Sequence, residues 1–412
     1  MTGFAREGTT LLGDGVSLAE AAKRHGTPLY VYSRDLIAES YRAYETAFAP
    51  IPHRVCYAVK ANGAGAILRL LASLGAGADI VSGLELRAAL RAGFPPDRIV
   101  FSGVGKTDDE IAAGLEAGIG EFNAESAEEI ARISALAAAR GRRAALTLRV
   151  NPDIDARSHP YISTGLRDNK FGVDIASAEA ILDTARRLPG IDVAGVQCHI
   201  GSQIRFLDPL GEAVTALVAL TRRLLAQGYA LRTIDIGGGL GVNYEEGTGP
   251  DVGAFAAAVV PRLKDLGLLV LLEPGRSLVA RAGVLLTRVL YVKENHGKRF
   301  VIVDAGMNDL LRPALYKAHH RIELVETRGR ETRLVDVVGP VCETADAFAR
   351  DRELESVEPG ELLAIRDTGA YGFVMASTYN MRPRPAEVMI EDGQVRLIRR
   401  RETFEDLIAT EV

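Results

Sequence analysis

The chain has 412 residues, which exceeds what one hydrophobic core usually supports, so we expect two domains. Its formal net charge of −5 comes without a long basic block, which argues against a nucleic-acid surface. No apolar stretch approaches the roughly 18 residues of a membrane span, and no signal-peptide core is found at the start.

The first 33 residues predict one helix and one strand. Ser17 and Glu20 form a capping pattern for a helix that Gly26 ends. Leu29–Tyr32 then reads as a strand. We expect this strand to join a sheet formed by the C-terminal part of the chain.

The most regular pattern alternates apolar strands with amphipathic helices such as Ser126–Arg140 and Gly211–Ala226. Eight strand–helix units over about 250 residues predict a (β/α)8 barrel, whose active site lies at the C-terminal ends of its strands. The predicted strands are Val55–Val59, Asp79–Ser82, Ile99–Ser102, Glu121–Asn123, Ala145–Val150, Val193–His199, Thr233–Ile236 and Leu268–Leu272.

Two further regions complete the predicted organisation. The connection Asn151–Asp174 is long, polar and rich in turn residues, and such loops often act as lids. Beyond Ser277 the runs become shorter and richer in β-branched residues, which predicts an all-β domain. The expected domains are therefore a barrel over 34–277 and a discontinuous β domain of 1–33 plus 278–412. The predicted strands of the β domain are Gly283–Val292, Arg299–Asp304, Arg333–Val338, Glu361–Ile365 and Glu387–Ile390.

Four motifs at predicted strand ends point to one cofactor. They are YAVKAN with Lys60, HIGS (His199–Ser202), GGGLG (Gly237–Gly241) and EPGR (Glu273–Arg276). A lysine amine can form a Schiff base with an aldehyde, and glycine-rich strand ends can present backbone N–H groups to a phosphate. An aldehyde and a phosphate on one aromatic ring describe pyridoxal 5'-phosphate.

Each motif alone has a structural alternative: a surface lysine, a core histidine, a tight turn and a salt-bridged turn. Their joint placement at the ends of strands 1, 6, 7 and 8 of one barrel favours the cofactor site. The three cysteines, Cys56, Cys198 and Cys342, share no metal-like spacing and indicate a reduced, cytoplasmic setting. No metal site is predicted, and we expect the adjacent His319 and His320 to be exposed.

Taken in order, the motifs resemble the diaminopimelate decarboxylase family, a group of fold type III, alanine-racemase-like pyridoxal phosphate enzymes. The resemblance runs from about Gly26 to about Thr410. It implies a carboxy-lyase that converts meso-2,6-diaminopimelate to L-lysine and CO2, the last step of lysine biosynthesis. The motifs are YAVKAN, CHIGSQ, DIGGGLG, EPGRSLVA, VDAGMNDLLRPALY, GPVCETAD and the segment RVNPDIDARSHPYISTGLRDNKFG.

The resemblance also implies a role for each barrel residue. Lys60 would carry the cofactor, Glu273 would face the pyridine nitrogen, and His199 would stack on the ring with Asp79 supporting it. The phosphate would be held by Ser202, Gly237, Gly238, Gly239, Gly275, Arg276 and Tyr371.

The substrate and the final proton are assigned in the same way. Cys342 would protonate the carbanion after CO2 loss and would come from the partner subunit, so the resemblance implies a homodimer with shared active sites. The substrate would contact Arg276, Arg312, Tyr316, Glu343 and Tyr371. Arginine suits the distal carboxylate because its guanidinium pairs with two oxygens.

One departure and three rival functions stay open. After Glu343 the family pattern has a Ser-Gly-Asp-like continuation, whereas this chain has Thr344, Ala345 and Asp346. The rivals are a decarboxylase of ornithine, arginine or carboxynorspermidine, an amino-acid racemase, and a non-catalytic regulator. A racemase typically has an arginine at the pyridine nitrogen, which Glu273 disfavours, and a regulator would be expected to lose Lys60 or Cys342.

Overall fold

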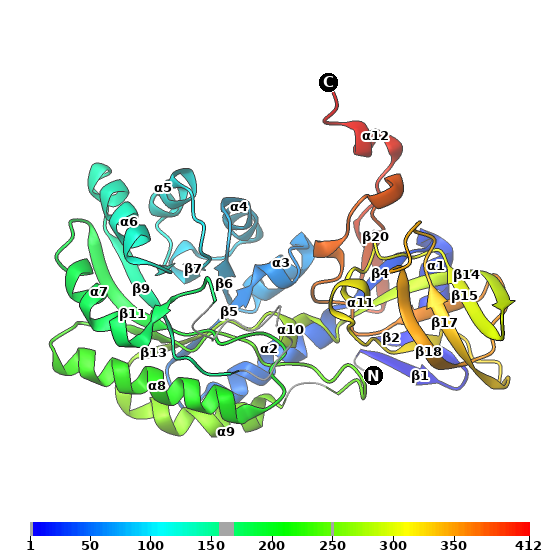
Figure 1. The fold of residues 1–412 in the computed structure, drawn as a ribbon, viewed down its shortest axis with the longest axis horizontal. Coiled ribbons are helices and arrows are strands. Elements are labelled where there is room, and N and C mark those ends of the chain that lie inside the picture. Colours follow the sequence, from blue (N-terminus) through cyan, green and yellow to red (C-terminus); the bar gives the residue numbers. More distant parts are fainter. Residues whose placement is uncertain (1–2, 156–168, 249–250) are drawn as a thin grey trace. The chain divides into compact units, whose positions relative to one another are not determined.

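The computed structural model describes residues 3–155, 169–248 and 251–412. These form two compact units (Figure 1). One unit comprises Ser40–Gly241 and Pro250–Ser277, and the other comprises Met1–Glu39, Val242–Gly249 and Leu278–Val412. The second unit therefore includes a short segment, Val242–Gly249, that lies inside the predicted barrel range. The domain bounds 34–277 and 278–412 stay predictions.

The first unit is a closed barrel of eight parallel strands, as predicted. Each strand pairs with the next, and the last pairs with the first, through Val270 and His53. A two-residue strand, β10 (Val173–Asp174), pairs in parallel with the last two residues of β9. The barrel strands are β5 (His53–Ala58), β6 (Gly77–Ile80), β7 (Ile99–Phe101), β8 (Glu121–Ala124), β9 (Ala144–Asn151), β11 (Ile191–Gln197), β12 (Thr233–Asp235) and β13 (Leu269–Leu272).

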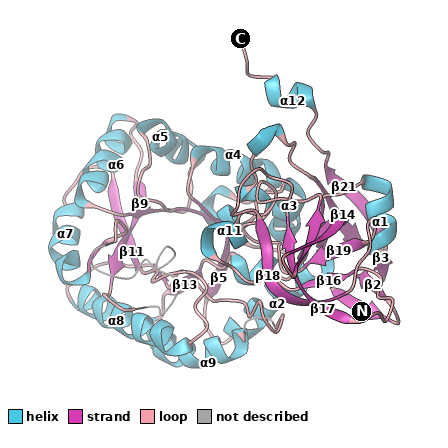
Figure 2. Ribbon diagram, turned by 45° about the vertical axis from the view of Figure 1, so that its right-hand side comes forward, coloured by secondary structure: helices cyan, strands magenta, loops and turns pink. Residues whose placement is uncertain are grey.

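Helices surround this barrel in Figure 2. Several of them begin at polar caps, as at Ser126, whose hydroxyl accepts the Glu129 N–H at 3.1 Å, because the first N–H groups of a helix have no partner within it. The helices are α2 (Arg34–Phe48), α3 (Gly65–Ser73), α4 (Gly83–Ala92), α5 (Asp108–Ala117), α6 (Ala127–Ala139), α7 (Ala178–Ala185), α8 (Leu207–Ala226) and α9 (Val252–Leu263).

The second unit is built on a mixed β-sheet, which confirms the predicted all-β character. β4 (Leu29–Ser33) lies between β14 (Gly283–Asn295) and β20 (Ala386–Glu391), so the N-terminal strand does join the C-terminal sheet. The other strands of this sheet are β15 (Lys298–Val303), β16 (Ile322–Leu324), β17 (Thr332–Val338), β18 (Ala347–Glu355), β19 (Leu362–Ile365) and β21 (Gln394–Arg399).

Smaller elements complete the second unit. A three-stranded sheet of β1 (Phe4–Glu7), β2 (Thr10–Gly13) and β3 (Val16–Ser17) precedes α1 (Leu18–His25), whose caps are Ser17 and Gly26 as predicted. The short helices are α11 (Arg312–Tyr316) and α12 (Phe404–Ile408), and α10 (Arg276–Val279) follows the last barrel strand. Apolar residues of α1, β4, β14 and β20 form one buried core, including Leu18, Leu29, Val284 and Val388. Within the described ranges, no helix is long and apolar enough to cross a membrane.

Candidate active site

Lys60 follows the first barrel strand directly. The strand was predicted to run to Val59, but β5 ends at Ala58, and Lys60 lies in a 3₁₀ turn over Val59–Ala61. The turn puts its amine 2.7 Å from the Asp79 carboxylate, which is fully buried one residue before the end of β6. The resemblance implies that Asp79 supports His199 against the cofactor, which stays a prediction, and in this structure the Asp79 carboxylate pairs with Lys60. That pairing keeps the lysine at the C-terminal end of the barrel.

Three glycines after β12 fit only because they have no side chain. A Cβ on Gly237 would lie 2.4 Å from the Cys198 carbonyl oxygen, one on Gly238 would lie 2.1 Å from the Glu273 carbonyl oxygen, and one on Gly239 would lie 2.3 Å from the Gly201 carbonyl oxygen. Gly237 and Gly239 also have positive φ values of 66° and 104°. The ends of strands β11, β12 and β13 therefore meet as closely as backbone allows.

His199 lies in this convergence, two residues beyond β11. Its Nδ1 accepts the Gly238 N–H at 3.2 Å, and its carbonyl oxygen accepts an N–H of Arg149 at 3.3 Å. Loss of solvation, and then the positive charges of Arg149 and Lys60, lower the pKa of His199 well below its ordinary value. The ring is therefore neutral at pH 7, with its proton on Nε2.

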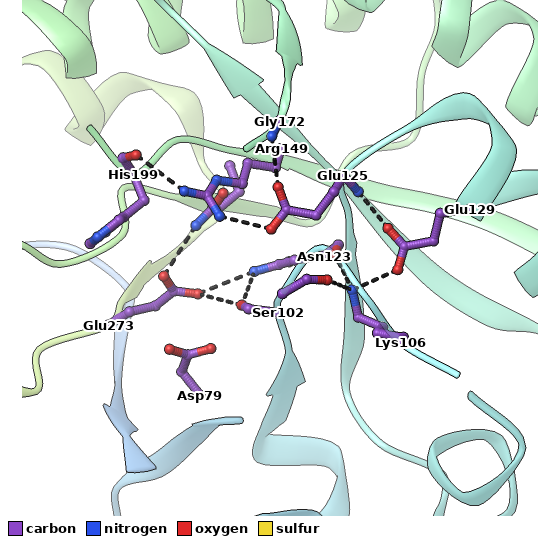
Figure 3. Close-up of polar contacts among 12 residues, drawn as sticks. Asp79, Ser102, Lys106, Asn123, Glu125, Glu129, Arg149, Gly172, His199 and Glu273 are labelled. Atoms are coloured by element: carbon purple, nitrogen blue, oxygen red, sulfur yellow. Dashed lines mark hydrogen bonds and ion pairs between the residues drawn. The ribbon is translucent and has the colours of Figure 1, made fainter. Parts of the chain in front are cut away.

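Glu273 follows β13 and is the centre of a buried polar network (Figure 3). One carboxylate oxygen accepts from Asn123 Nδ2 at 3.1 Å and from Ser102 Oγ at 3.4 Å. The other accepts from Gln197 Nε2 at 3.1 Å. These neutral donors come from the ends of β7, β8 and β11, so the carboxyl group is held from three sides.

Burial and mutual repulsion disfavour negative charge in this network. Burial, and then the charges of Asp235 and Asp79, raise the pKa of Glu273 well above its ordinary value. Burial also raises the pKa of Asp235 to about 7. A group that brings a positive charge or a proton to Glu273 would offset the cost of negative charge in this buried network, and a pyridinium nitrogen is such a group.

A buried ion pair connects His199 to the loop that follows β9. Arg149 Nη1 lies 2.7 Å from Glu125 Oε1, and the other Glu125 oxygen accepts the Gly172 N–H at 2.7 Å (Figure 3). A second ion pair joins Lys106 to Glu129 at 2.8 Å (Figure 3). Much of the predicted lid, 156–168 of Asn151–Asp174, lies outside the described residues, so the lid stays a prediction.

Gly275 and Arg276 follow the last barrel strand, β13. Arg276 is buried, and its Nη2 donates to Ser202 Oγ at 3.1 Å. A Cβ on Gly275 would lie 3.0 Å from the Ala61 Cβ, beside the turn that carries Lys60. Every barrel residue of the predicted site therefore lies at the C-terminal ends of the strands.

The other predicted residues belong to the second unit. Arg312 begins α11 and is 5% exposed, and Tyr316 ends the same helix with partial exposure. Tyr371 has a positive φ of 55°, an uncommon conformation for a tyrosine. The prediction that His320 is exposed is wrong, because it is fully buried beside Arg312.

Cys342 and Glu343 lie on an exposed loop of the second unit. Asn380 Oδ1 accepts the Cys342 N–H at 2.9 Å, and Asp346 accepts the Val341 N–H at 2.6 Å and the Met307 N–H at 2.7 Å. Asp346 is the member of the expected Ser-Gly-Asp continuation that this chain retains. The buried carboxylate anchors the loop through these two backbone N–H groups.

Cys342 is also the accessible cysteine. Cys56 and Cys198 are buried free thiols, whereas Cys342 is an exposed one. Burial raises the pKa of Cys56 well above its ordinary value and that of Cys198 to about 12. Neither buried thiol is suited to exchange a proton with a ligand at neutral pH.

The glycine convergence gives a direct test of the barrel rim. We expect Gly238→Ala to destabilise the protein by about 1–3 kcal/mol, because the added methyl must displace the Glu273 carbonyl oxygen. Gly211→Ala is the matched control, since a Cβ there meets nothing within 4 Å. Thermal unfolding by circular dichroism compares the two variants. A Gly238→Ala protein as stable as the control would contradict this close packing at the rim.

A barrel with a lysine, glycine-rich loops and a buried carboxylate at the C-terminal strand ends is typical of pyridoxal enzymes. Residues 34–280 match the family model for the pyridoxal-dependent decarboxylase, pyridoxal binding domain. The predicted cofactor and reaction class are thereby confirmed.

The relatives narrow this class further. The chain is 51% identical to the diaminopimelate decarboxylase of Pseudomonas aeruginosa, over 100% of this chain and 99% of that protein. It is also similar to the crystal structure of diaminopimelate decarboxylase from Helicobacter pylori complexed with L-lysine, with a TM-score of 0.92 and 46% identity over 95% of this chain and 98% of that one. The M. jannaschii enzyme in co-complex with L-lysine gives a TM-score of 0.95 and 40% identity over 100% and 99% of the chains. The chain belongs to the diaminopimelate decarboxylase family.

Proposed function

We propose that this protein decarboxylates meso-2,6-diaminopimelate to L-lysine and CO2 with pyridoxal 5'-phosphate as its cofactor. The observation that carries the proposal is the barrel rim, where Lys60, the Gly237–Gly239 loop and Glu273 converge from three strand ends. Family membership over the full chain supports the same reaction.

The residues of the rim fit this cofactor. The Gly237–Gly239 loop has no side chains to block approach to its backbone, and Ser202 with Arg276 adds a hydroxyl and a buried cation. Such a donor set suits a phosphate. Glu273 would face the pyridine nitrogen, because a pyridinium there relieves the repulsion within the buried acidic cluster.

When bound, this cofactor supplies an aldehyde that links to amines and a ring that accepts the electrons left by departing CO2. Lys60 would provide the protein's amine, and Asp79 would hold that amine at the rim. The neutral His199 ring would lie against the cofactor without adding a competing positive charge. Glu273 would keep a proton at the ring nitrogen, which strengthens the electron sink.

Substrate recognition would come from the second unit together with Arg276. Arg312 would bind the distal carboxylate with help from Tyr316, and Glu343 would face the distal ammonium. Arg276 and Tyr371 would contact both the phosphate and the substrate. The burial of Arg312 supports this assignment, because a buried guanidinium gains more from a carboxylate than an exposed one does.

We also propose that Cys342 donates a proton in the active site of a partner subunit. Its thiol is exposed, and its backbone N–H donates to the side chain of Asn380, which lies in the segment Tyr379–Met381. Tyr379 and Met381 are themselves 44% and 60% exposed. Apolar side chains beside an accessible thiol are typical of a surface that a partner covers. The cytoplasmic location stays a prediction.

A substrate panel separates this proposal from the rivals. Purified protein with cofactor should release CO2 from meso-diaminopimelate and not from L-ornithine, L-arginine or carboxynorspermidine. Release from one of these instead would favour the related decarboxylases. Inversion of a substrate centre without CO2 release would indicate a racemase, and a protein inert with all of them would indicate a regulator.

Arg312 should determine the preference for a distal carboxylate. We expect Arg312→Ala to lose about 2–5 kcal/mol of transition-state binding for meso-diaminopimelate, because it removes one partner of a buried charge-assisted pair. The measurement is kcat/KM, and Arg333→Ala on the exposed part of β17 is the control. Wild-type turnover of L-ornithine or L-lysine alongside meso-diaminopimelate would contradict this selectivity.

A further inference from the structure

Arg312 is held by a histidine that no part of the proposed mechanism has used. Arg312 Nη1 lies 2.8 Å from His320 Nε2, and His320 Nδ1 lies 2.7 Å from the Arg366 carbonyl oxygen. Arg312 is 5% exposed and His320 is 0% exposed. The buried contact with His320 therefore sets the orientation of the Arg312 guanidinium before any ligand binds.

The hydrogen-bond chemistry defines the form of the imidazole. A carbonyl oxygen can only accept, so Nδ1 of His320 carries the hydrogen. A guanidinium can only donate, so Nε2 accepts from Arg312 through its lone pair. Both bonds exist together only in the neutral Nδ1–H tautomer, which makes His320 an acceptor for a buried cation.

Rigid backbone fixes the position of this ring. His320 lies just before β16 and Arg366 just after β19, and these strands pair with Ile322 opposite Ile365. The Arg366 N–H donates to the Arg321 carbonyl oxygen at 2.9 Å. Arg352 Nη1 also donates to the His320 carbonyl oxygen at 2.9 Å. A ring positioned by paired strands can orient a neighbour more precisely than one on a loop.

Tyr244 also contacts the guanidinium of Arg312. Its ring centroid lies 4.6 Å from Arg312 Cζ and 5.1 Å from the His320 ring, with the two rings inclined by 66°. Stacking on an aromatic face leaves the edge of a guanidinium, with its N–H groups, directed elsewhere. Tyr244 and the neutral His320 ring carry no charge, so they orient the arginine without neutralising it.

We infer that His320 and Tyr244 are positioning residues that hold Arg312 ready for the distal carboxylate of the substrate. The inference rests on the proposed function and extends it, since it assigns dicarboxylate selectivity to a Tyr244–Arg312–His320 cluster within the second unit. Neither residue needs to touch the substrate. Their effect on turnover must therefore pass through Arg312.

The matched variants are His320→Leu, which removes the acceptor, and His320→Gln, which retains one acceptor and one donor. We expect His320→Leu to raise KM for meso-diaminopimelate by about 10- to 100-fold, as for a lost hydrogen bond to a charged group, with a smaller change in kcat. His320→Gln should keep KM close to the wild-type value, because it retains an acceptor for Arg312. The cofactor content, measured by absorbance, should be unchanged in both, because His320 is not among the residues that would hold the cofactor.

A double-mutant cycle separates positioning from general structural support. In an Arg312→Ala background, His320→Leu should cause no further loss of kcat/KM, because its effect requires the arginine. Tyr244→Leu is tested in the same cycle, so that the dependence on Arg312 can still be measured if His320→Leu does not fold. If the wild type is active and the losses of kcat/KM from the two single variants add in the double variant, this inference is wrong but the proposed function stands. A wild type without turnover of meso-diaminopimelate would overturn the proposed function and this inference with it.

Discussion

Lys60→Ala is expected to lose both the covalently held cofactor and the activity. The lysine amine is the group that follows β5 and is held by Asp79 at the rim. Without it, no amine is available at this position to link the protein to the aldehyde, and kcat should fall on the order of 10⁴-fold or more.

Covalent attachment can be measured without turnover. Borohydride treatment of the cofactor-loaded wild type, followed by peptide mass spectrometry, should find the cofactor on the peptide that contains Lys60. Lys264→Ala, which removes an exposed lysine, is the control and should be labelled like the wild type. A Lys60→Ala protein that borohydride still traps on the cofactor would show that another amine carries it.

Cys342→Ala is expected to bind the cofactor normally and to lose turnover by roughly 10²–10⁴-fold, the usual contribution of a positioned acid. Because Cys342 is exposed, the substitution should leave the fold unchanged, and thermal unfolding checks this. The absorbance of the bound cofactor should match that of the wild type. Full activity of Cys342→Ala would require a different proton donor.

Mixing Cys342→Ala with Lys60→Ala tests whether the site is shared. If chains pair at random, half of the dimers are mixed, and each mixed dimer has one complete site, so activity should recover to about a quarter of wild type. The control mixes Lys60→Ala with Glu273→Gln. Both changes lie in the barrel, so no complete site forms. Verified mixed dimers that stay inactive would rule out the shared site.

The barrel could be predicted because its strands are short, largely buried runs, most of them mainly apolar, that alternate with amphipathic helices. The strand ends were less predictable, as at Lys60, because polar residues and turns follow the apolar run immediately. The sheet of β1, β2 and β3 was missed because glycines divide Phe4–Ser17 into runs of one to four residues. Pairing between them, rather than local pattern, makes these residues strands.

The glycine loops and Lys60 were recognisable because they fall together at the predicted strand ends of one barrel. The network around Glu273 was not, since Ser102, Asn123 and Gln197 are single polar residues at three separate strand ends. Only barrel closure brings them together. A polar residue ending each successive barrel strand is the signal that could have found them. His320 was misjudged because two adjacent histidines look polar, whereas the pairing of β16 with β19 buries one of them.

The most direct test of the proposed function is a product assay on the purified, cofactor-loaded protein with meso-diaminopimelate as the sole substrate. CO2 release and chiral analysis of the amino-acid product are measured in the same reaction. We expect one L-lysine for each CO2 released, and loss of both products in Lys60→Ala. No CO2 release by the loaded wild type, or CO2 release without L-lysine, would contradict it.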